Sequence, residues 1–257
     1  MSITMNSAPL IEVQNLFQKI GTQEILRGIT LSIYPGETLV LLGRSGGGKS
    51  VFLRHLIGLM KPVYGRILFE GRDITQLNER QLEPIRCKIG MLFQDGALFD
   101  SLSVFDNVAF PLREHCMQDE KEIREKVHKA LALVNMIGHD GKVPVALSGG
   151  MRKRVALARA IISPPSVILY DEPTAGLDPI VSDSINRLIR RLQGQLQVTS
   201  IVVTHDMVSA YHVGDRIALL DHGRIYFCGS LQQLRLSSDP VIRNFVEGRS
   251  SESSETE

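Results

Sequence analysis

Short uninterrupted apolar runs alternate with longer segments of helical spacing along most of this chain of 257 residues. Runs without polar interruption predict strands buried on both faces, as in a largely parallel sheet. They lie at 38–42, 88–93, 167–170 and 199–204. Residues 10–34 instead alternate between apolar and polar positions, which predicts a small antiparallel sheet near the N-terminus. A hairpin is predicted at 215–229, with its turn at His222-Gly223.

The spacing of apolar residues becomes helical between residues 96 and 165. One predicted helix carries its apolar positions on a single face: Ile123, Val127, Leu131, Val134 and Ile137. Another helix is predicted to begin at Pro179 and to end near Gly194, because glycine favours helix ends. These elements predict an α/β fold with a mostly parallel core sheet, an N-terminal antiparallel β subdomain and a helical subdomain inserted at about 96–165.

The composition is that of a globular protein, with 43% hydrophobic and 22% charged residues. Because the net charge is only +1, composition implies no general attraction to nucleic acid. No apolar run approaches the length that spans a bilayer and no signal peptide is indicated, so work at a membrane would require a membrane-bound partner. The cysteines, Cys87, Cys116 and Cys228, are far apart and are expected to be ordinary thiols. The Ser- and Glu-rich segment 248–257 is predicted to be disordered.

The segment "GRSGGGKS", residues 43–50, fits the pattern G-x-x-x-x-G-K-[ST] between a predicted strand and an apolar helix. We call these residues the P-loop. Its glycines let backbone N–H groups face phosphates, Lys49 is expected to reach the β- and γ-phosphates, and the Ser50 hydroxyl is expected to bind Mg²⁺. The residues predicted to bind ATP here are Gly43, Arg44, Ser45, Gly46, Gly47, Gly48, Lys49, Ser50 and Val51.

Two acidic residues follow the apolar run in "VILYDEP" (167–173), at the expected end of a strand. Asp171 is predicted to hold Mg²⁺, and Glu172 is predicted to be the base for the attacking water. Gln94 and His205 also end predicted strands, where ligands bind in sheets of this kind. We expect the Gln94 amide to contact Mg²⁺ or its water, and the His205 imidazole to meet the γ-phosphate.

A second anion site is predicted in "ALSGGMRKR", residues 146–154, where Ser148, Gly149 and Gly150 precede a basic helical segment. Free backbone N–H groups at a helix start, without Cβ atoms in the way, suit a phosphate. The basic residues that follow, Arg152, Lys153 and Arg154, are interpreted as a solvated helix face, because nucleic-acid binding would call for interleaved aromatic residues.

The P-loop, Gln94, "LSGGM", "VILYDEP", "GLD" at 176–178 and His205 together resemble ABC-transporter ATPase domains in order and spacing, over about residues 10–230. The resemblance implies one ABC-type P-loop ATPase domain at 10–247 that pairs head to tail with a second copy of itself. Each ATP would lie between one subunit's P-loop and the other subunit's Ser148, Gly149 and Gly150. Asp178 of "GLD" is carried over as a further nucleotide-binding residue.

A finer resemblance rests on residues 91–115, on Met151 and on "DPVIRNFVEG" (239–248), which are similar to Mla-type, MCE-associated lipid transporters. It implies movement of phospholipid or related hydrophobic molecules between membranes. The implied partners are a multi-spanning permease, an MCE-domain protein and, in many systems, a small STAS-like subunit, with this chain peripheral on the cytoplasmic face of the inner membrane. The permease is expected at the region after Gln94 that contains Ala97, Leu98, Phe99, Val104 and Phe105.

Two positions depart from the ABC pattern, and two other functions stay open. Ile20 stands where ABC domains usually place an aromatic residue that stacks on adenine, and Phe17 is the nearest aromatic. Met151 replaces the usual glutamine after the glycines. The ABC motifs alone also fit the ATPase of an importer for a small polar solute such as an amino acid. A soluble ABC ATPase acting on DNA or ribosomes fits less well, because the sequence shows neither a tandem second domain nor a long coiled-coil insertion.

Overall fold

The structure is a computed structural model that describes residues 8–115 and 119–249. The segment predicted to be disordered lies outside the described residues from position 250 onward, and so does Cys116. Cys87 and Cys228 are thiols, as expected. Within the described ranges, no helix combines the length and the apolar composition that a bilayer-spanning segment needs.

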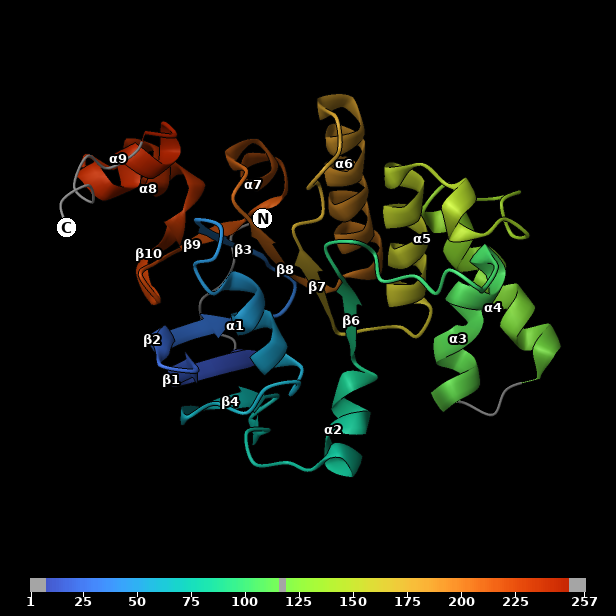
Figure 1. The fold of residues 1–257 in the computed structure, drawn as a ribbon, viewed down its shortest axis with the longest axis horizontal. Coiled ribbons are helices and arrows are strands. Elements are labelled where there is room, and N and C mark those ends of the chain that lie inside the picture. The colour runs from blue at the N-terminus through green and yellow to red at the C-terminus, as the bar shows by residue number, and fades with distance from the viewer. Residues whose placement is uncertain (1–7, 116–118, 250–257) are drawn as a thin grey trace.

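A six-stranded sheet forms the centre of the molecule, in the order β10-β9-β3-β8-β7-β6 (Figure 1). Neighbouring strands from β9 to β6 are parallel, and only β10 runs antiparallel to its neighbour, which confirms the predicted mostly parallel core. The strands are β3 (Thr38–Gly43), β6 (Ile89–Leu92), β7 (Val167–Asp171), β8 (Thr199–Thr204), β9 (Arg216–Asp221) and β10 (Arg224–Ser230). The predicted hairpin is β9–β10, which turns at His222 and Gly223, both with positive φ.

A separate four-stranded antiparallel sheet has the order β2-β1-β4-β5. Its strands are β1 (Ile11–Ile20), β2 (Gln23–Ile33), β4 (Tyr64–Phe69) and β5 (Arg72–Asp73). The alternating pattern of residues 10–34 predicted the first two strands and their antiparallel pairing. The partners β4 and β5 are short and follow α1, so they carried no comparable pattern.

The side chains of the central sheet point alternately into two cores. Leu39 and Leu41 of β3 pack with α1 (Lys49–Leu56), α2 (Glu79–Arg86) and the antiparallel sheet. Val40 and Leu42 point to the opposite face and pack with the remaining α-helices. Those helices are α3 (Val104–His115), α4 (Glu120–Leu133), α5 (Gly149–Ile161), α6 (Pro179–Leu196), α7 (Met207–Val213), α8 (Leu231–Leu236) and α9 (Pro240–Val246). The helices α1 and α5 therefore cover opposite faces of one sheet.

The helical insertion lies between β6 and β7 and consists of α3, α4, a 3₁₀ turn at Pro144–Ala146 and α5. The apolar face predicted for α4 is buried at Ile123, Val127 and Leu131, and Val134 directly after the helix is also buried. The prediction is wrong for Ile137, which is 73% exposed. The helix has already ended at Leu133, and the chain turns at Asn135, whose φ is 57°.

The helix predicted from Pro179 is α6, and its first turn is capped by Asp178. One carboxylate oxygen of Asp178 accepts hydrogen bonds from the backbone N–H groups of Ile180 and Val181, both at 3.0 Å. The prediction that the helix ends at Gly194 is wrong, because α6 continues to Leu196 and Gln197 adopts the left-handed conformation at its end. Gln197 thus occupies the helix-end position that glycine usually fills.

The C-terminal segment 239–248 forms the short helix α9. Ile242 is buried, and Phe245 and Val246 pack against the core that also contains α5, α6 and α7. Most of the apolar side of α9 is therefore satisfied within the chain.

Two glycines give opposite predictions for stability. A Cβ atom at Gly90 of β6 would lie 2.3 Å from the carbonyl oxygen of Ala160 in α5, whereas Gly194 in α6 has nothing within 4 Å. We expect Gly90→Ala to lower the free energy of unfolding by about 2 kcal/mol or more, because strand and helix must separate. Gly194→Ala is expected to raise it by up to about 1 kcal/mol, because alanine favours a helix interior.

Urea unfolding followed by circular dichroism measures both changes. A Gly90→Ala protein as stable as the wild type would contradict the close packing of β6 on α5. A destabilised Gly194→Ala protein would contradict the continuation of α6 through this position.

Candidate functional site

Four neighbouring strands end in the residues that the sequence analysis assigned to the site. In sheet order, β3 leads into the P-loop, β8 into His205, β7 into Asp171 and Glu172, and β6 into Gln94. Because all four strands are parallel, these residues gather at one carboxyl edge of the sheet. The structure thus brings together the groups that the sequence placed separately at predicted strand ends.

The P-loop is an exposed turn that leads directly into α1. Gly46 and Gly48 have φ values of 75° and 94°, which favour glycine. A Cβ atom on Gly48 would also lie 2.9 Å from a side-chain carbon of Ile25, so the turn has no room for a larger residue there. The loop borders a hollow of about 220 Å³ whose other wall comes from 23–25 and 221–223. Backbone N–H groups at the start of α1 lack helical partners and are suited to an anion.

The first residue of α1 is Lys49, whose ammonium group is almost completely buried. Its Nζ donates hydrogen bonds to the carbonyl oxygens of Gly43 at 2.9 Å and Arg44 at 3.1 Å. It also forms an ion pair with Glu172, with 3.3 Å between Nζ and Oε1. The lysine is therefore held inside the loop by carbonyl groups and across the site by one carboxylate.

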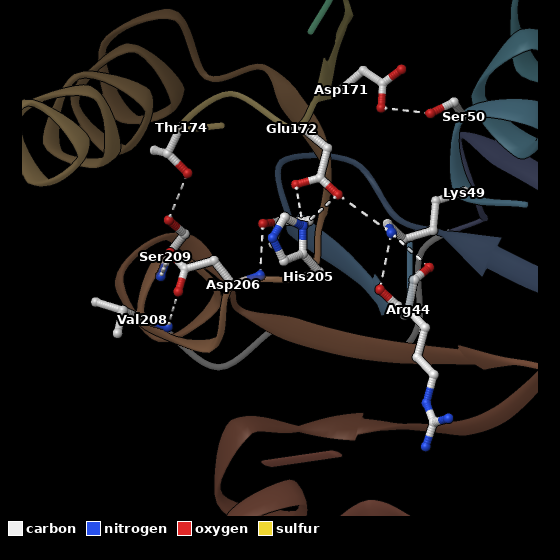
Figure 2. A network of polar contacts seen from close by, with 12 residues as sticks. Arg44, Lys49, Ser50, Asp171, Glu172, Thr174, His205, Asp206, Val208 and Ser209 are labelled. Carbon is white, nitrogen blue, oxygen red and sulfur yellow. Dashed lines mark hydrogen bonds and ion pairs between the residues drawn. The ribbon is translucent and has the colours of Figure 1, made fainter. Parts of the chain in front are cut away.

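Glu172 occupies the middle of the polar network that Figure 2 shows. Its carboxylate lies 3.0 Å from Nδ1 of His205 and 3.3 Å from Nζ of Lys49, with these two partners on either side of it. The backbone of Glu172 is left-handed, with φ of 46°, which is costly for a residue with a side chain. This turn explains how two consecutive residues, Asp171 and Glu172, both face the site although neighbours on a strand point in opposite directions.

Asp171 and Ser50 form a second polar pair beside this network. The Ser50 hydroxyl donates a hydrogen bond of 2.9 Å to Asp171, which joins the start of α1 to the end of β7. Burial raises the pKa of Asp171, and the nearby carboxylate of Glu172 adds to the rise, while the bond from Ser50 opposes it. A hydroxyl lies here beside a carboxylate whose charge is only partly compensated. This pair suits Mg²⁺, which proteins hold with one or two oxygen ligands and substrate phosphates.

Gln94 and His205 occupy turns at the same edge of the sheet. Gln94 follows β6 with an exposed side chain, and its backbone carbonyl accepts a hydrogen bond from Lys153. His205 follows β8 with its side chain 54% exposed. Asp206 caps α7 by accepting bonds from the N–H groups of Val208 and Ser209, and these bonds orient the turn that carries His205.

The segment predicted to be a second anion site, Ser148–Gly150, lies at the start of α5. Ser148 is the N-cap of this helix, and its hydroxyl accepts a bond of 3.3 Å from the N–H of Met151. A Cβ on Gly150 would lie 2.6 Å from a methyl carbon of Val181, so this glycine also lets α5 and α6 pack closely. Because α5 covers the face of the sheet opposite to α1, the two segments predicted to bind phosphate lie on different sides of the sheet.

The interpretation of Arg152, Lys153 and Arg154 as a solvated face is wrong. Lys153 is only 5% exposed and bonds to the carbonyls of Gln94 and Glu172. Arg152 donates to the carbonyl of Leu147, and Arg154 donates to the carbonyl of Val134 and to Ser184. All three cations of this segment are used within the chain.

The burial of Lys153 could have been predicted from its position on the helix. Gly150, Lys153 and Leu157 are spaced at three and four positions, so they share one face of α5. All three are buried. A cation on the apolar face of a helix is expected to have a partner inside the protein.

Only part of the region expected to receive a permease lies at the surface. Ala97 and Phe99 line an apolar groove of about 400 Å³ at the junction of β6, α3 and α5. Phe110 and Met91 lie on its walls, and Arg159 supplies a charge. By contrast, Val104 is fully buried, and Leu98 and Phe105 pack against the core of the helical insertion. Two of the five predicted surface residues therefore face the groove.

Phe17 is turned away from the P-loop helix. The neighbouring residue, Gln18, bonds to His55 of α1, and consecutive residues of a strand point to opposite faces. The Phe17 ring lies against Gly28 and forms an edge contact with Tyr64, with 6.1 Å between ring centroids. Ile20 at the end of β1 is 50% exposed.

Residues 26–175 match the model of a protein family described as "ABC transporter". The chain is 45% identical over 239 residues to the "Probable ribonucleotide transport ATP-binding protein mkl" of Mycobacterium tuberculosis, which covers 93% of this chain and 67% of that protein. It is 42% identical over 241 residues to the "Intermembrane phospholipid transport system ATP-binding protein MlaF" of Haemophilus influenzae, which covers 94% of this chain and 91% of that protein.

A solved structure of the ATP-binding cassette MJ0796, a dimer in a post-hydrolysis state bound to ADP and Pi, superposes with a TM-score of 0.79. The sequences are 31% identical, and the match covers 86% of this chain and 98% of that one. These similarities agree with the order of the motifs in the sequence and with the four strand ends that bring them together. The chain belongs to the ABC transporter family, and it is an ATP-binding cassette that hydrolyses ATP.

Proposed function

We propose that this chain powers an ABC transporter that moves phospholipid or a related hydrophobic molecule between membranes. The observation that carries the catalytic part is the Glu172 carboxylate, held between Lys49 and His205 at the edge of the sheet. The cargo is supported by the similarity to MlaF, which extends over 91% of that protein.

The contacts of Lys49 indicate how ATP binding would free Glu172 to act as the base. In the structure its ammonium is shared between P-loop carbonyls and Glu172. Phosphate oxygens in the P-loop would compete for this ammonium, because a charged acceptor forms stronger hydrogen bonds than a carbonyl. Glu172 would then be released to accept a proton from the attacking water, and His205 would stay beside both the base and the γ-phosphate.

The predicted Mg²⁺ would be held by Ser50 and by Asp171, with Gln94 as a further contact. When bound, it would neutralise charge on the β- and γ-phosphates. The hydrogen bond between Ser50 and Asp171 already keeps the two oxygen ligands together. The other residues predicted to bind the nucleotide, including Asp178, are part of this proposal.

A second copy of the chain is proposed as the partner at the nucleotide. The start of α5 is exposed at Ser148, and this helix covers the face of the sheet opposite to the P-loop helix. A head-to-tail pair would give each P-loop the Ser148–Gly150 segment of the partner. The cassette MJ0796, solved as a dimer with ADP and Pi, supports this arrangement by similarity.

The apolar groove beside the loop after β6 is proposed to receive a permease. It combines exposed aromatic surface, including Phe99 at 43% exposure, with the loop that carries Gln94. Contact with a permease would keep the chain at the cytoplasmic face of the inner membrane as a peripheral subunit. An MCE-domain protein and a small STAS-like subunit complete the proposed Mla-type system.

A second candidate cargo is a small polar solute. The 45% identity to mkl, which is named as a probable ribonucleotide transport protein, favours it. We rank lipid first because MlaF matches this chain over nearly the whole length of both proteins, whereas mkl matches over 67% of its own length.

One transport experiment tests both parts of this proposal. The full chain is purified with the membrane subunits that accompany it and placed in vesicles, as wild type, Glu172→Gln and Glu70→Gln. We expect ATP-dependent transfer of a fluorescent phospholipid between vesicles and no ATP-dependent ribonucleotide accumulation. Glu172→Gln should lower hydrolysis by about a hundredfold or more while ATP still binds, because positioning survives and the base is lost.

Glu70→Gln is the matched control, because this exposed glutamate pairs with Lys88, which precedes β6 at the edge of the sheet opposite to the candidate site. It should retain both activities. Near-normal hydrolysis by Glu172→Gln would exclude Glu172 as the base. ATP-driven accumulation of ribonucleotide without lipid transfer would replace the lipid proposal with the second candidate.

The position of Phe17 predicts weak discrimination between ATP and GTP. Ile20 offers an aliphatic surface, and Phe17 points away from the P-loop helix, so neither provides an aromatic platform. We expect dissociation constants for ATP and GTP within about tenfold of each other, unchanged by Phe17→Ala. Ile20→Tyr should tighten ATP binding by about 1 kcal/mol, the size of a stacking contribution.

Equilibrium binding of fluorescent nucleotide analogues to the full chain measures these constants. A strong ATP preference that is lost in Phe17→Ala would contradict the orientation of Phe17 described above.

A further inference from the structure

Lys153 is a buried cation whose partners are two backbone carbonyls at the carboxyl edge of the central sheet. It lies in the first turns of α5 and is 5% exposed. Its Nζ donates to the carbonyl oxygen of Gln94 and, at 3.3 Å, to that of Glu172. Burial lowers the pKa of Lys153, and the nearby carboxylates of Asp95, Asp171 and Glu172 oppose the decrease. A buried ammonium is costly, so these contacts need an explanation beyond helix packing.

The two carbonyls belong to different strand ends, and the lysine belongs to a third element. Gln94 follows β6, Glu172 follows β7, and Lys153 lies three residues after Gly150 of the second anion site. One side chain therefore links the helix that starts at Ser148 to the loop of Gln94 and to the residue proposed as base.

The contact with Glu172 falls on a strained part of the backbone. The left-handed conformation is costly for a residue with a side chain and persists only where its surroundings fix it. The N–H of Glu172 donates to the carbonyl of Val203 at 2.9 Å, and its own carbonyl accepts from Ala175 at 3.2 Å as well as from Lys153. Because the carboxylate follows this backbone, a loss of one restraint would shift it relative to His205 and Lys49.

A second cation of α5 holds the next part of the same loop. Arg159 donates to the carbonyl of Gly96 at 2.8 Å and to that of Ala97 at 2.7 Å. Both Arg159 and Ala97 line the apolar groove. The loop from Gln94 to Ala97 is thus attached to α5 at both ends, so a displacement at the groove would reach the carbonyl contacts of Lys153.

We propose that Lys153 is a positioning residue for ATP hydrolysis, which holds the Glu172 backbone and the Gln94 loop in the geometry in which the carboxylate can act. This inference rests on the proposed role of Glu172 as the base. Lys153 does not touch the reacting atoms; it acts through the two carbonyls.

Arg154 provides a matched control on the same helix. It is a partly buried cation that donates to the carbonyl of Val134 and to Ser184, and thus joins α5 to the end of α4 and to α6. If the cations of α5 only stabilise the packing of helices, Lys153→Met and Arg154→Met should have similar effects.

The test compares Lys153→Met, Arg154→Met, Glu172→Gln and the double variant Lys153→Met/Glu172→Gln in the full chain with its membrane subunits. We expect Lys153→Met to lower kcat by between about tenfold and about a hundredfold, because small displacements of reacting groups are costly. Its KM for ATP should change by less than about twofold, because the P-loop contacts are intact. Arg154→Met should keep kcat within about twofold of wild type.

The double variant distinguishes positioning from general damage. If Lys153 acts through Glu172, Lys153→Met should reduce the residual hydrolysis of Glu172→Gln by less than about twofold, because the group that it positions is already lost. Should Lys153→Met not fold, Lys153→Gln, whose amide can make only one of the two contacts well, takes its place with the same expected division between kcat and KM.

Three results would overturn the inference. They are a wild-type kcat in Lys153→Met, an equal loss of kcat in Arg154→Met, and an equal fold-loss in the wild-type and Glu172→Gln backgrounds. Near-normal hydrolysis by Glu172→Gln alone would instead remove the proposed base, and with it the premise on which the role of Lys153 depends.

Discussion

The five parallel strands of the central sheet are buried on both faces along nearly their whole length, and this constraint decides where polar chemistry can lie. The interiors of these five strands offer no exposed side, so their charged groups appear only where the strands begin or end. The parallel direction of the strands collects those ends at one edge. The same burial requires helices on both faces, which places α1 with its P-loop on one side and α5 with Ser148 on the other.

The charges at that edge are balanced by contacts across elements. Asp171 and Glu172 bring two carboxylates to the end of β7, and Lys49 from α1, His205 from the turn after β8 and Lys153 from α5 surround them. Each contact ties one helix or turn to β7. A change in the contacts of Lys49 would therefore affect α1 and, through Glu172 and Lys153, the helix α5.

The sequence was sufficient where one local pattern decides the structure. Continuous apolar runs predicted β3, β6, β7 and β8, and the P-loop pattern required a specific strand–turn–helix context that the structure contains. It was insufficient where tertiary contacts decide. Ile137 continues the spacing of α4 beyond the end of that helix, and Gly194 could stay helical because other residues support α6. Lys153 was misjudged because its partners are backbone carbonyls, which every sequence contains and no side-chain pattern marks.

One nucleotide is proposed to lie between the P-loop of one chain and the Ser148–Gly150 segment of another. Mixing Ser148→Arg subunits with Lys49→Ala subunits tests it most directly. If the sites are shared, a mixed dimer has one site with both defects and one intact site, and the mixture should hydrolyse ATP faster than either parent. If both anion sites served the same chain's nucleotide, every site would be defective. No gain over the parents, under conditions where a dimer with one wild-type subunit is active, would contradict shared nucleotide sites.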